Sequence, residues 1–408
     1  MGGPLSGCRV IELSHIMAGP ACGLMLADMG ADVIKVEKAT GDDTRRSVPP
    51  DIKGESAAYM MMNRNKRGIV LDLKSEGGKQ VLRRLIKDAD VVLENYRKGT
   101  MEKLGLGYDE LKKENPGLIY VEISGFGRTG PYAERGGFDL IAQGMSGLMS
   151  ITGEGAGRQP VKVGAPVSDI TAGILAAMGV SAAYAHKLKT GEGQKVDTSL
   201  FEAAITHTYW QSAIAFATQE APEPMGSAHP LNAPYQAFQT SNGWINIGAA
   251  NQSNWEKLGA LIDALHLLED PRFVTNAKRM ENRLLLEAEL NEIICKRSTE
   301  DWLSIFEQGG LPSGPVLSIL DMHNDPQAKA RDMVPEVEHP IAGKMQTLGL
   351  PVKFSGTPGG VNSAAPLLGE HTLEVLIEAG YDEEEAKRLI GSGAAAQYEL
   401  KDGTNSCR

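Results

Sequence analysis

An aspartate stands at the start of the most apolar stretch of the chain. Asp169 directly precedes the 16-residue run 170–185, which is rich in Ala and Gly. Aspartate is a favoured helix N-cap residue, so the pattern predicts a long helix from Asp169 to about Leu188. A helix N-terminus also stabilises an ionised carboxylate, which can act as a covalent nucleophile. The residue by itself leaves both interpretations open, a structural cap and a nucleophile.

A second candidate is the segment 125–130, GFGRTG, which matches the GxGxxG pattern and follows an expected strand. A dinucleotide site needs a helix directly after such a loop and an acidic residue about 20 positions later. Residues 131–137 do not begin an apolar helix, and the stretch near Ser150 has no suitable acid. We therefore interpret the segment as a glycine-rich loop that shapes some other pocket.

Metal and serine-hydrolase chemistry have no motif here. The eight histidines lack HxH or HExxH spacing, and no GxSxG occurs. The cysteines lack CxxC spacing, which disfavours a structural zinc site and predicts free thiols in a reducing compartment. The N-terminus has no basic start followed by an apolar run, so we expect a cytoplasmic protein. The four cysteines are Cys8, Cys22, Cys295 and Cys407.

Length and charge narrow the class further. A chain of 408 residues suggests two to three domains, and a net charge of −11 argues against a nucleic-acid partner. The run 170–185 is short for a membrane span, so a buried core helix is expected and no membrane partner. Residues 1–110 nevertheless hold 17 basic and 16 acidic residues, leaving −12 for the remainder. This asymmetry is compatible with a solvated surface or with an anion site in the N-terminal half.

The N-terminal part alternates between short apolar runs and helical patterns, which predicts a mostly parallel α/β sheet. Expected strands cover 9–13, 31–37, 68–73, 90–94, 118–124 and 195–198, and expected helices cover 21–29, 78–89, 104–115, 170–188 and 200–218. Pro, Gly, Ser and His then dominate 220–232, which we interpret as a linker. A smaller unit with an aromatic segment at 235–249 and helices near 255–268, 282–296 and 299–308 follows, and the last expected helix is 372–379.

Several motifs in this order resemble the class III CoA-transferases, the family of formyl-CoA, carnitine and bile-acid CoA-transferases. The resemblance spans nearly the whole chain, and the dicarboxylate CoA-transferases are the most similar type. The motifs that carry it are LSHIMAGP (13–20), GADVIKVE (30–37), NRNKR (63–67), ENY (94–96), GFGRTGP (125–131), SD (168–169), TGEGQ (190–194), GSAHP (226–230), GPV (314–316) and PLLGEHT (366–372).

The resemblance implies a large domain with a Rossmann-like parallel sheet and a smaller α+β domain. Two such ring-like chains are expected to interlock as a homodimer. The large domain would comprise 1–219, the linker 220–232 and the small domain 233–325, and 326–408 would return to complete the large domain.

The family nucleophile maps onto Asp169. Its carboxylate would attack the thioester of a donor such as succinyl-CoA, and the reaction would pass through an aspartyl anhydride and an aspartyl-CoA thioester to a small carboxylic or dicarboxylic acid. The implied partners are therefore acyl-CoA and carboxylic acids, with no tightly bound cofactor and no metal. Family contacts to CoA map onto His15, Met17, Ala18, Lys38, Leu71, Lys74, Asn95 and Lys103.

Candidates for contacts with the transferred acid are less specific, and they include backbone N–H donors near Met17 and at 226–229 for the developing oxyanions. Relatives often have Gln where this chain has Met17, which removes a side-chain donor. The substrate candidates are Arg45, Arg46, Tyr59, Arg64, Phe138, Asp139, Gly226 and His229.

Two alternatives remain. An acyl-CoA racemase or isomerase of the same fold also has an aspartate matching Asp169. Its proton shuttle needs the histidine of a Gly-His-Asp motif, and this chain has Phe138 there, which cannot exchange protons. A non-catalytic CoA-binding protein is the other alternative, and it would bind CoA without transferring it.

Overall fold

The computed structural model describes residues 2–401 and 404–407, and the chain divides into two compact units. Unit 1 comprises residues 1–148, 163–208 and 326–408, and unit 2 comprises 149–162 and 209–325. The chain crosses to unit 2 after Leu148, returns at Val163, crosses again after Thr208 and returns at Pro326. The expected helix 200–218 is two helices, α8 (Leu200–Thr206) and α9 (Tyr209–Thr218), and the second crossing lies between them.

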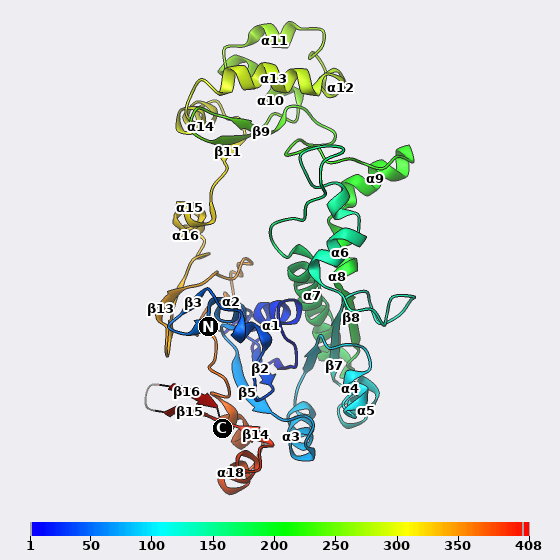
Figure 1. The fold of residues 1–408 in the computed structure, drawn as a ribbon, viewed down its shortest axis with the longest axis vertical. Helices are drawn as coiled ribbons and strands as arrows, with labels where there is room; N and C mark the ends of the chain where they lie inside the picture. Colours follow the sequence, from blue (N-terminus) through cyan, green and yellow to red (C-terminus); the bar gives the residue numbers. More distant parts are fainter. Residues whose placement is uncertain (1, 402–403, 408) are drawn as a thin grey trace. The chain divides into compact units, whose positions relative to one another are not determined.

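A seven-stranded sheet forms the centre of unit 1 (Figure 1). Its order is β14-β5-β2-β1-β6-β7-β8, with six parallel strands and β14 antiparallel to β5. In register, Ile11 of β1 pairs with Ile34 of β2 and with Val92 of β6. The expected α/β class with a mostly parallel sheet is confirmed. The strands are β1 (Arg9–Glu12), β2 (Asp32–Glu37), β5 (Arg67–Leu71), β6 (Val91–Glu94), β7 (Ile119–Ser124), β8 (Lys195–Ser199) and β14 (Ala395–Ala396).

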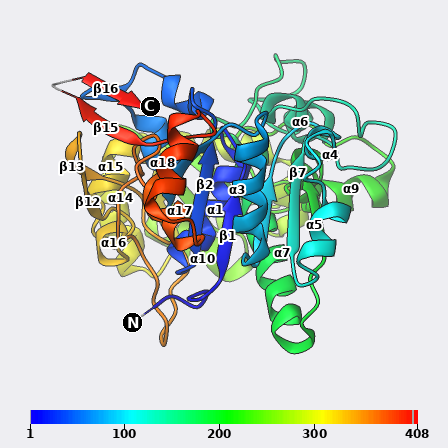
Figure 2. The same cartoon turned by 90° about the horizontal axis from the view of Figure 1, so that it is seen from below.

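Helices cover both faces of this sheet, because alternate strand residues point to opposite sides. Val10, Val33 and Val121 pack against α1 (Ala18–Asp28) and α7 (Val167–Thr190). Ile11, Ile34 and others pack on the opposite face against α3 (Glu76–Lys87), α5 (Tyr108–Glu114), α17 (Thr372–Glu378) and α18 (Glu383–Gly391), most of which face the viewer in Figure 2. Burial on both faces explains why these strands are almost continuously apolar.

Some expected elements are wrong in detail. The helix expected at 104–115 begins only at Tyr108, as α5, and a separate short helix that was not expected, α4 (Thr100–Lys103), precedes it. Helix α18 was not expected, although Asp382 and Glu385 form a capping box that is visible in the sequence.

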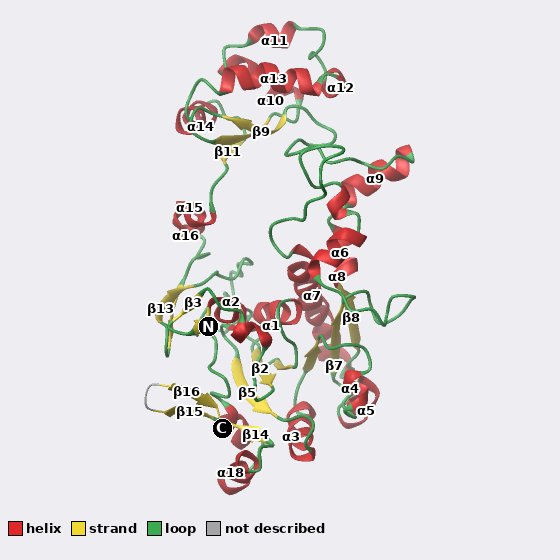
Figure 3. Ribbon diagram, viewed as in Figure 1, coloured by secondary structure: helices red, strands yellow, loops and turns green. Residues whose placement is uncertain are grey.

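Unit 2 is a small α+β unit (Figure 3). It includes helix α9, in which no residue is buried. Strands β9 (Tyr235–Gln239), β10 (Trp244–Gly248) and β11 (Ser313–Pro315) form an antiparallel sheet. Trp255, Phe273, Trp302 and Phe306 form the centre of its core. Its further helices are α10 (Gln252–Leu261), α11 (Leu265–Glu269), α12 (Asn276–Glu281), α13 (Arg283–Ile294), α14 (Thr299–Gln308) and α15 (Ile319–Asn324).

The remaining elements belong to unit 1, and the side chains of residues 399–408, Cys407 among them, lie outside the described part of the chain. These elements are η1 (Asp43–Arg46), β3 (Asp51–Ile52), β4 (Glu55–Ser56), α2 (Ala57–Asn63), α6 (Asp139–Met145), η2 (Leu148–Ser150, which reaches into unit 2), α16 (Pro326–Ala330), β12 (Glu336–His339), β13 (Gly343–Gln346), β15 (Tyr398–Lys401) and β16 (Thr404–Cys407).

The contact between α1 and α7 is very close. A Cβ atom on Gly173 of α7 would lie 2.6 Å from Cβ of Ala21 and 2.7 Å from the carbonyl oxygen of Ala18. Among the described residues, α7 is the one helix long and apolar enough to cross a membrane, and here it packs against α1 and the sheet.

We therefore expect Gly173→Ala to destabilise the fold, since neither helix backbone can give way without moving the other. The free energy of unfolding measured in urea should fall by about 1–3 kcal/mol, as in other overpacked cores. Gly391→Ala at the end of α18 is the control, because its new Cβ meets no atom within 4 Å. An unchanged free energy for Gly173→Ala would contradict this account of the contact.

Candidate active site

A cavity of about 290 Å³ lies at the carboxyl ends of the parallel strands in unit 1. The segments at the ends of β1, β6 and β7 contribute His15–Ala18, Asn95–Lys98, and Ser124, Gly125 and Arg128 to its wall. Open parallel sheets bind ligands at this edge, because successive loops converge there.

Asp169 lines this cavity as the third residue of α7. The prediction that it is the helix N-cap is wrong, since α7 begins at Val167 and its N-cap residue is Pro166. The carboxylate that caps the helix comes from another segment. Oδ1 of Asp139 accepts a hydrogen bond of 2.9 Å from the Ser168 N–H group, and Oδ2 accepts one of 2.7 Å from Gln143. The side chain of Asp169 is therefore not needed as the cap.

The protonation of Asp169 is shifted by its surroundings. Burial, and secondly the negative charge of Asp139, raises the pKa of the Asp169 carboxyl from 3.8 to about 7. Asp169 can therefore ionise near neutral pH, and its carboxylate is more basic and more nucleophilic than an exposed one. Such shifts are frequent at functional sites.

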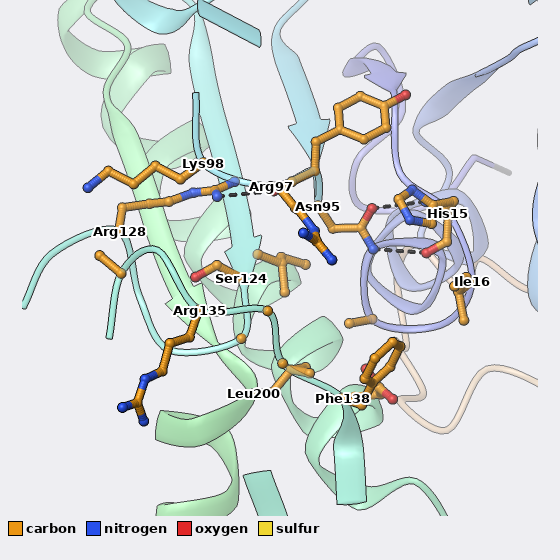
Figure 4. Close-up of a pocket in the computed structure, with 18 of the residues that line it drawn as sticks. His15, Ile16, Asn95, Arg97, Lys98, Ser124, Arg128, Arg135, Phe138 and Leu200 are labelled. Atoms are coloured by element: carbon orange, nitrogen blue, oxygen red, sulfur yellow. Dashed lines mark hydrogen bonds between the residues drawn. The ribbon is translucent and has the colours of Figure 1, made fainter. Parts of the chain in front are cut away.

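The loop after β1 faces Asp169 and is held rigidly. The N–H group of His15 donates to Oδ1 of Asn95 (3.0 Å), and Nδ2 of Asn95 donates to the His15 carbonyl (2.8 Å), as Figure 4 shows. Helix α1 begins directly afterwards, and Met17 provides no side-chain cap for it. The contact at Gly173 sets the first turn of α7 beside the first turn of α1, so Met17, Ala18 and Asp169 line one cavity.

The glycine-rich segment 125–130 also has a structural explanation. A Cβ on Gly125 would lie 2.7 Å from the Cα of Gly137, so two glycine backbones cross at this wall. Both glycines and Phe138 line the cavity. The segment shapes the pocket, which agrees with the interpretation that it is not a dinucleotide loop.

Four basic residues of the wall were missed by the sequence analysis: Arg97, Lys98, Arg128 and Arg135. Lys98 pairs with Glu134, and Arg128 pairs with Glu94 and Glu122. The Arg135 guanidinium stacks on a tyrosine ring and points away from the cavity, whereas Arg97 extends into the space between Asn95 and Phe138 (Figure 4). The signal for Arg97 was its place just after the ENY motif at a strand end.

Many of the predicted site residues do come together. His15, Met17, Ala18, Asn95, Phe138 and Asp169 line the cavity, whereas Asp139 lies outside its lining and accepts a hydrogen bond from Ser168, the neighbour of Asp169. Lys38 lines a neighbouring cavity of about 130 Å³, which shares His15 and Tyr96 with the first. The rings of these two residues lie 5.6 Å apart.

Other predicted residues line neither cavity. Arg45 binds Glu37 and the Tyr59 hydroxyl, Arg46 pairs with Asp43, and Arg64 is buried against Asp28. The pairs of Arg45 and Arg64 are buried and could not be read from spacing, whereas Arg46 and Asp43 form an exposed pair three residues apart. Leu71 is buried at the end of β5, Lys74 lies in the loop between β5 and α3, and Lys103 is the last residue of α4. Gly226 and His229 belong to unit 2, where Gly226 lines a separate cavity and His229 stacks on Tyr235.

Comparison with known proteins identifies the family. The family model for CoA-transferase family III matches residues 5–372, which is most of the chain. The chain belongs to CoA-transferase family III. It is therefore an enzyme that transfers CoA and uses CoA thioesters as substrates.

Relatives of this transferase cover it almost completely. It is 40% identical to a succinate–glutarate CoA-transferase of Agrobacterium fabrum, over 92% of this chain and 95% of that protein. It is 38% identical to a succinyl-CoA:mesaconate CoA-transferase of Haloarcula marismortui, over 93% and 97% respectively. The crystal structure of a CAIB/BAIF family protein from Brucella suis superimposes with a TM-score of 0.84 at 40% identity, covering 93% of this chain and all of that one.

The site contains acids but no evident metal position. Among the side chains that the structure describes, residues 2–398, no three His, Cys, Asp or Glu residues are grouped to bind a metal ion. Phe138 occupies the position at which a racemase would need a histidine, and its side chain is 73% exposed at the cavity.

The raised pKa of Asp169 predicts a cost in stability. An acid whose pKa is higher in the folded than in the unfolded chain destabilises the fold increasingly as the pH rises between the two values. Asp169→Asn removes this effect. The variant should be more stable than the wild type at pH 8, and the difference should vanish near pH 4, as measured by urea unfolding at each pH.

The same substitution at exposed Asp109 of α5 is the matched control, and it should give no such gain at pH 8. If Asp169→Asn were no more stable than the wild type at pH 8, the raised pKa would be refuted.

Proposed function

We propose that this transferase moves CoA from succinyl-CoA to a small dicarboxylic acid through a covalent intermediate on Asp169. The observation that carries the proposal is the position of Asp169, partly buried in a strand-end cavity beside the uncapped first turn of α1. The names of the relatives support the choice of succinyl-CoA and of dicarboxylates such as glutarate or mesaconate.

The reaction has two symmetrical halves. The Asp169 carboxylate attacks the thioester carbonyl, the C–S bond breaks, and an aspartyl–succinyl anhydride and CoA thiolate form. The thiolate then attacks the aspartyl carbonyl and releases succinate, which leaves an aspartyl-CoA thioester. The acceptor carboxylate repeats these steps in reverse, and the free Asp169 carboxylate is regenerated.

Each attack places a negative charge on a carbonyl oxygen. The N–H groups of Met17 and Ala18 in the first turn of α1 are the donors that we assign to this oxyanion, with the helix N-terminus adding a partial positive charge. Partial burial favours the step, because fixed donors act more strongly where water is excluded.

The CoA moiety would extend from the first cavity to the second, past His15 and Tyr96. Lys38, Lys74 and Lys103 remain proposed contacts for its phosphates, and Leu71 for its nucleotide part. Arg97 is the better placed partner for the free carboxylate of a dicarboxylic acid, since Arg45, Arg46 and Arg64 are occupied by Glu37, Asp43 and Asp28. Gly226 and His229 stay proposed substrate contacts.

Free Cys8 and Cys22 in the core are compatible with a cytoplasmic location, which we also propose.

Trapping the intermediate tests the function. Wild-type enzyme with succinyl-CoA and glutarate should form glutaryl-CoA, whereas Asp169→Asn should lose at least about 10³-fold in rate, because the nucleophile is gone. Mass spectrometry after incubation with succinyl-CoA and hydroxylamine should place the modification on Asp169. Full activity of Asp169→Asn would refute the mechanism. Deuterium exchange at the α-carbon of an acyl-CoA without any acceptor would favour the racemase alternative.

We also propose a homodimer. Leu140, Ile141 and Met145 of α6 and Ile170, Ile174 and Met178 of α7 are exposed apolar side chains on adjacent helices of unit 1. None of the ten residues of α9 in unit 2 is buried. A soluble monomer rarely leaves so many large apolar groups uncovered, and a second copy of the chain is the occupant expected from the family.

Analytical ultracentrifugation should therefore give twice the mass of one chain. The double variant Ile174→Glu/Met178→Glu should sediment as a monomer, because two carboxylates cannot be desolvated in an apolar interface. Leu265→Glu, at a single exposed leucine of α11, is the control and should remain dimeric. A monomeric wild type would overturn the proposal.

A further inference from the structure

The loop between β1 and α1 contains a strained residue. Ile16 has φ 67°, in the left-handed region that a β-branched side chain rarely adopts. Its side chain is 41% exposed and lines the active-site cavity, so core packing does not impose this conformation. Such strain persists where surrounding contacts fix the backbone, and it occurs frequently at functional sites.

The contacts that fix this backbone are polar. The Ile16 N–H group donates to Oδ1 of Asp42 (3.2 Å), and Asn95 binds both the N–H and the carbonyl of His15.

On the two sides of the loop, lysine ammonium groups donate to backbone carbonyl oxygens. Lys35 Nζ donates to Ser14 (2.9 Å), and Lys66 Nζ donates to Pro20 (3.0 Å).

Three of these four anchoring side chains belong to one buried cluster of ions, which we call the ionic quartet: Glu12, Lys35, Asp42 and Lys66. Lys35 Nζ lies 3.1 Å from Glu12 and 3.0 Å from Asp42, and Lys66 Nζ lies 2.9 Å from Glu12. Their side chains are at most 1% exposed, and two positive charges balance two negative ones. Removing four charged groups from water has a high desolvation cost, so the quartet is weak evidence for stability. Its contacts favour a role in fixing one geometry.

Helix α1 lies directly on the quartet. A Cβ on Gly23 of α1 would lie 1.9 Å from Oε2 of Glu12. The quartet therefore fixes both the loop before α1 and the axis of α1 itself. The first-turn N–H groups of Met17 and Ala18 are set by these two constraints together.

We infer that the ionic quartet positions the active site: it holds Ile16 in its left-handed conformation and thereby aims the first turn of α1 at Asp169. This inference rests on the proposed function, since it assigns that turn to the developing oxyanion. The four residues are positioning residues, because none of them contacts the reacting atoms.

Asp42→Asn tests the inference, because it removes one charge of the quartet at nearly constant volume. It acts on the longest of the hydrogen bonds that hold the loop, the 3.2 Å bond from the Ile16 N–H group. With succinyl-CoA and glutarate we expect kcat to fall about tenfold and the KM for succinyl-CoA to change less than about threefold, since transition-state contacts affect kcat selectively. Adding Ile16→Gly should restore part of the loss, because glycine adopts a positive φ without strain. The single Ile16→Gly variant completes the cycle, in which the two effects should not multiply.

Asp28→Asn is the matched control. Asp28 is a similarly buried acid at the C-terminal end of α1, and it pairs with Arg64 away from the cavity. It should lower the melting temperature as Asp42→Asn does but leave kcat unchanged. An equal loss of kcat in both variants, or effects of Asp42→Asn and Ile16→Gly that simply multiply, would overturn the inference and leave the quartet a purely structural cluster.

Hydrogen exchange gives a readout that does not depend on activity. In the wild type the amide of Ile16 should be strongly protected, and Asp42→Asn should release it while Asp28→Asn does not. Random-coil exchange at Ile16 in the wild type would overturn the inference even if Asp42→Asn failed to fold. If the wild type transferred no CoA, the proposed function would fail, and the exchange data would still decide whether the quartet fixes the loop.

Discussion

The close contact between α1 and α7 at Gly173 is the constraint on which the active site depends. Only a residue without a side chain lets the two backbones approach so closely, and Asp169 lies one helical turn before this point on α7. The first turn of α1 consequently meets the first turn of α7 at the carboxyl ends of the strands. The Asp169 carboxylate and the amide groups of a helix N-terminus thus share one cavity, although about 150 residues separate them in the sequence.

Electrostatics then set the state of the carboxylate. A carboxyl used only as a helix cap would be ionised at low pH and weakly nucleophilic, because hydrogen bonds from the backbone favour its charged form. In this enzyme Asp139 occupies the capping position instead and adds a negative charge beside Asp169. The arrangement raises the pKa of Asp169 at the expense of stability, as is common where a site needs a reactive group.

The basic residues of the N-terminal part serve two different purposes. Arg45, Arg64, Lys35 and Lys66 neutralise buried acids and define the geometry of the loops around the site. Arg97 lines the first cavity, and Lys38 lines the second, where it also pairs with the exposed Asp43. The near balance of charge in residues 1–110 is therefore largely an internal balance, and the groups left for an anionic ligand are few and local.

The α/β class could be predicted from local patterns, since apolar runs such as 9–13 and 118–124 alternate with segments of helical periodicity. The sequence motifs also pointed to the family and to Asp169. Three features could be seen only in the folded chain: Asp139 caps α7, Arg45 and Arg64 form buried ion pairs, and Arg97 faces the cavity. Asp28 and Arg64 lie 36 positions apart in the sequence and form an ion pair only in the folded chain. A local sequence pattern carries no information about which charged side chains will contact each other after folding.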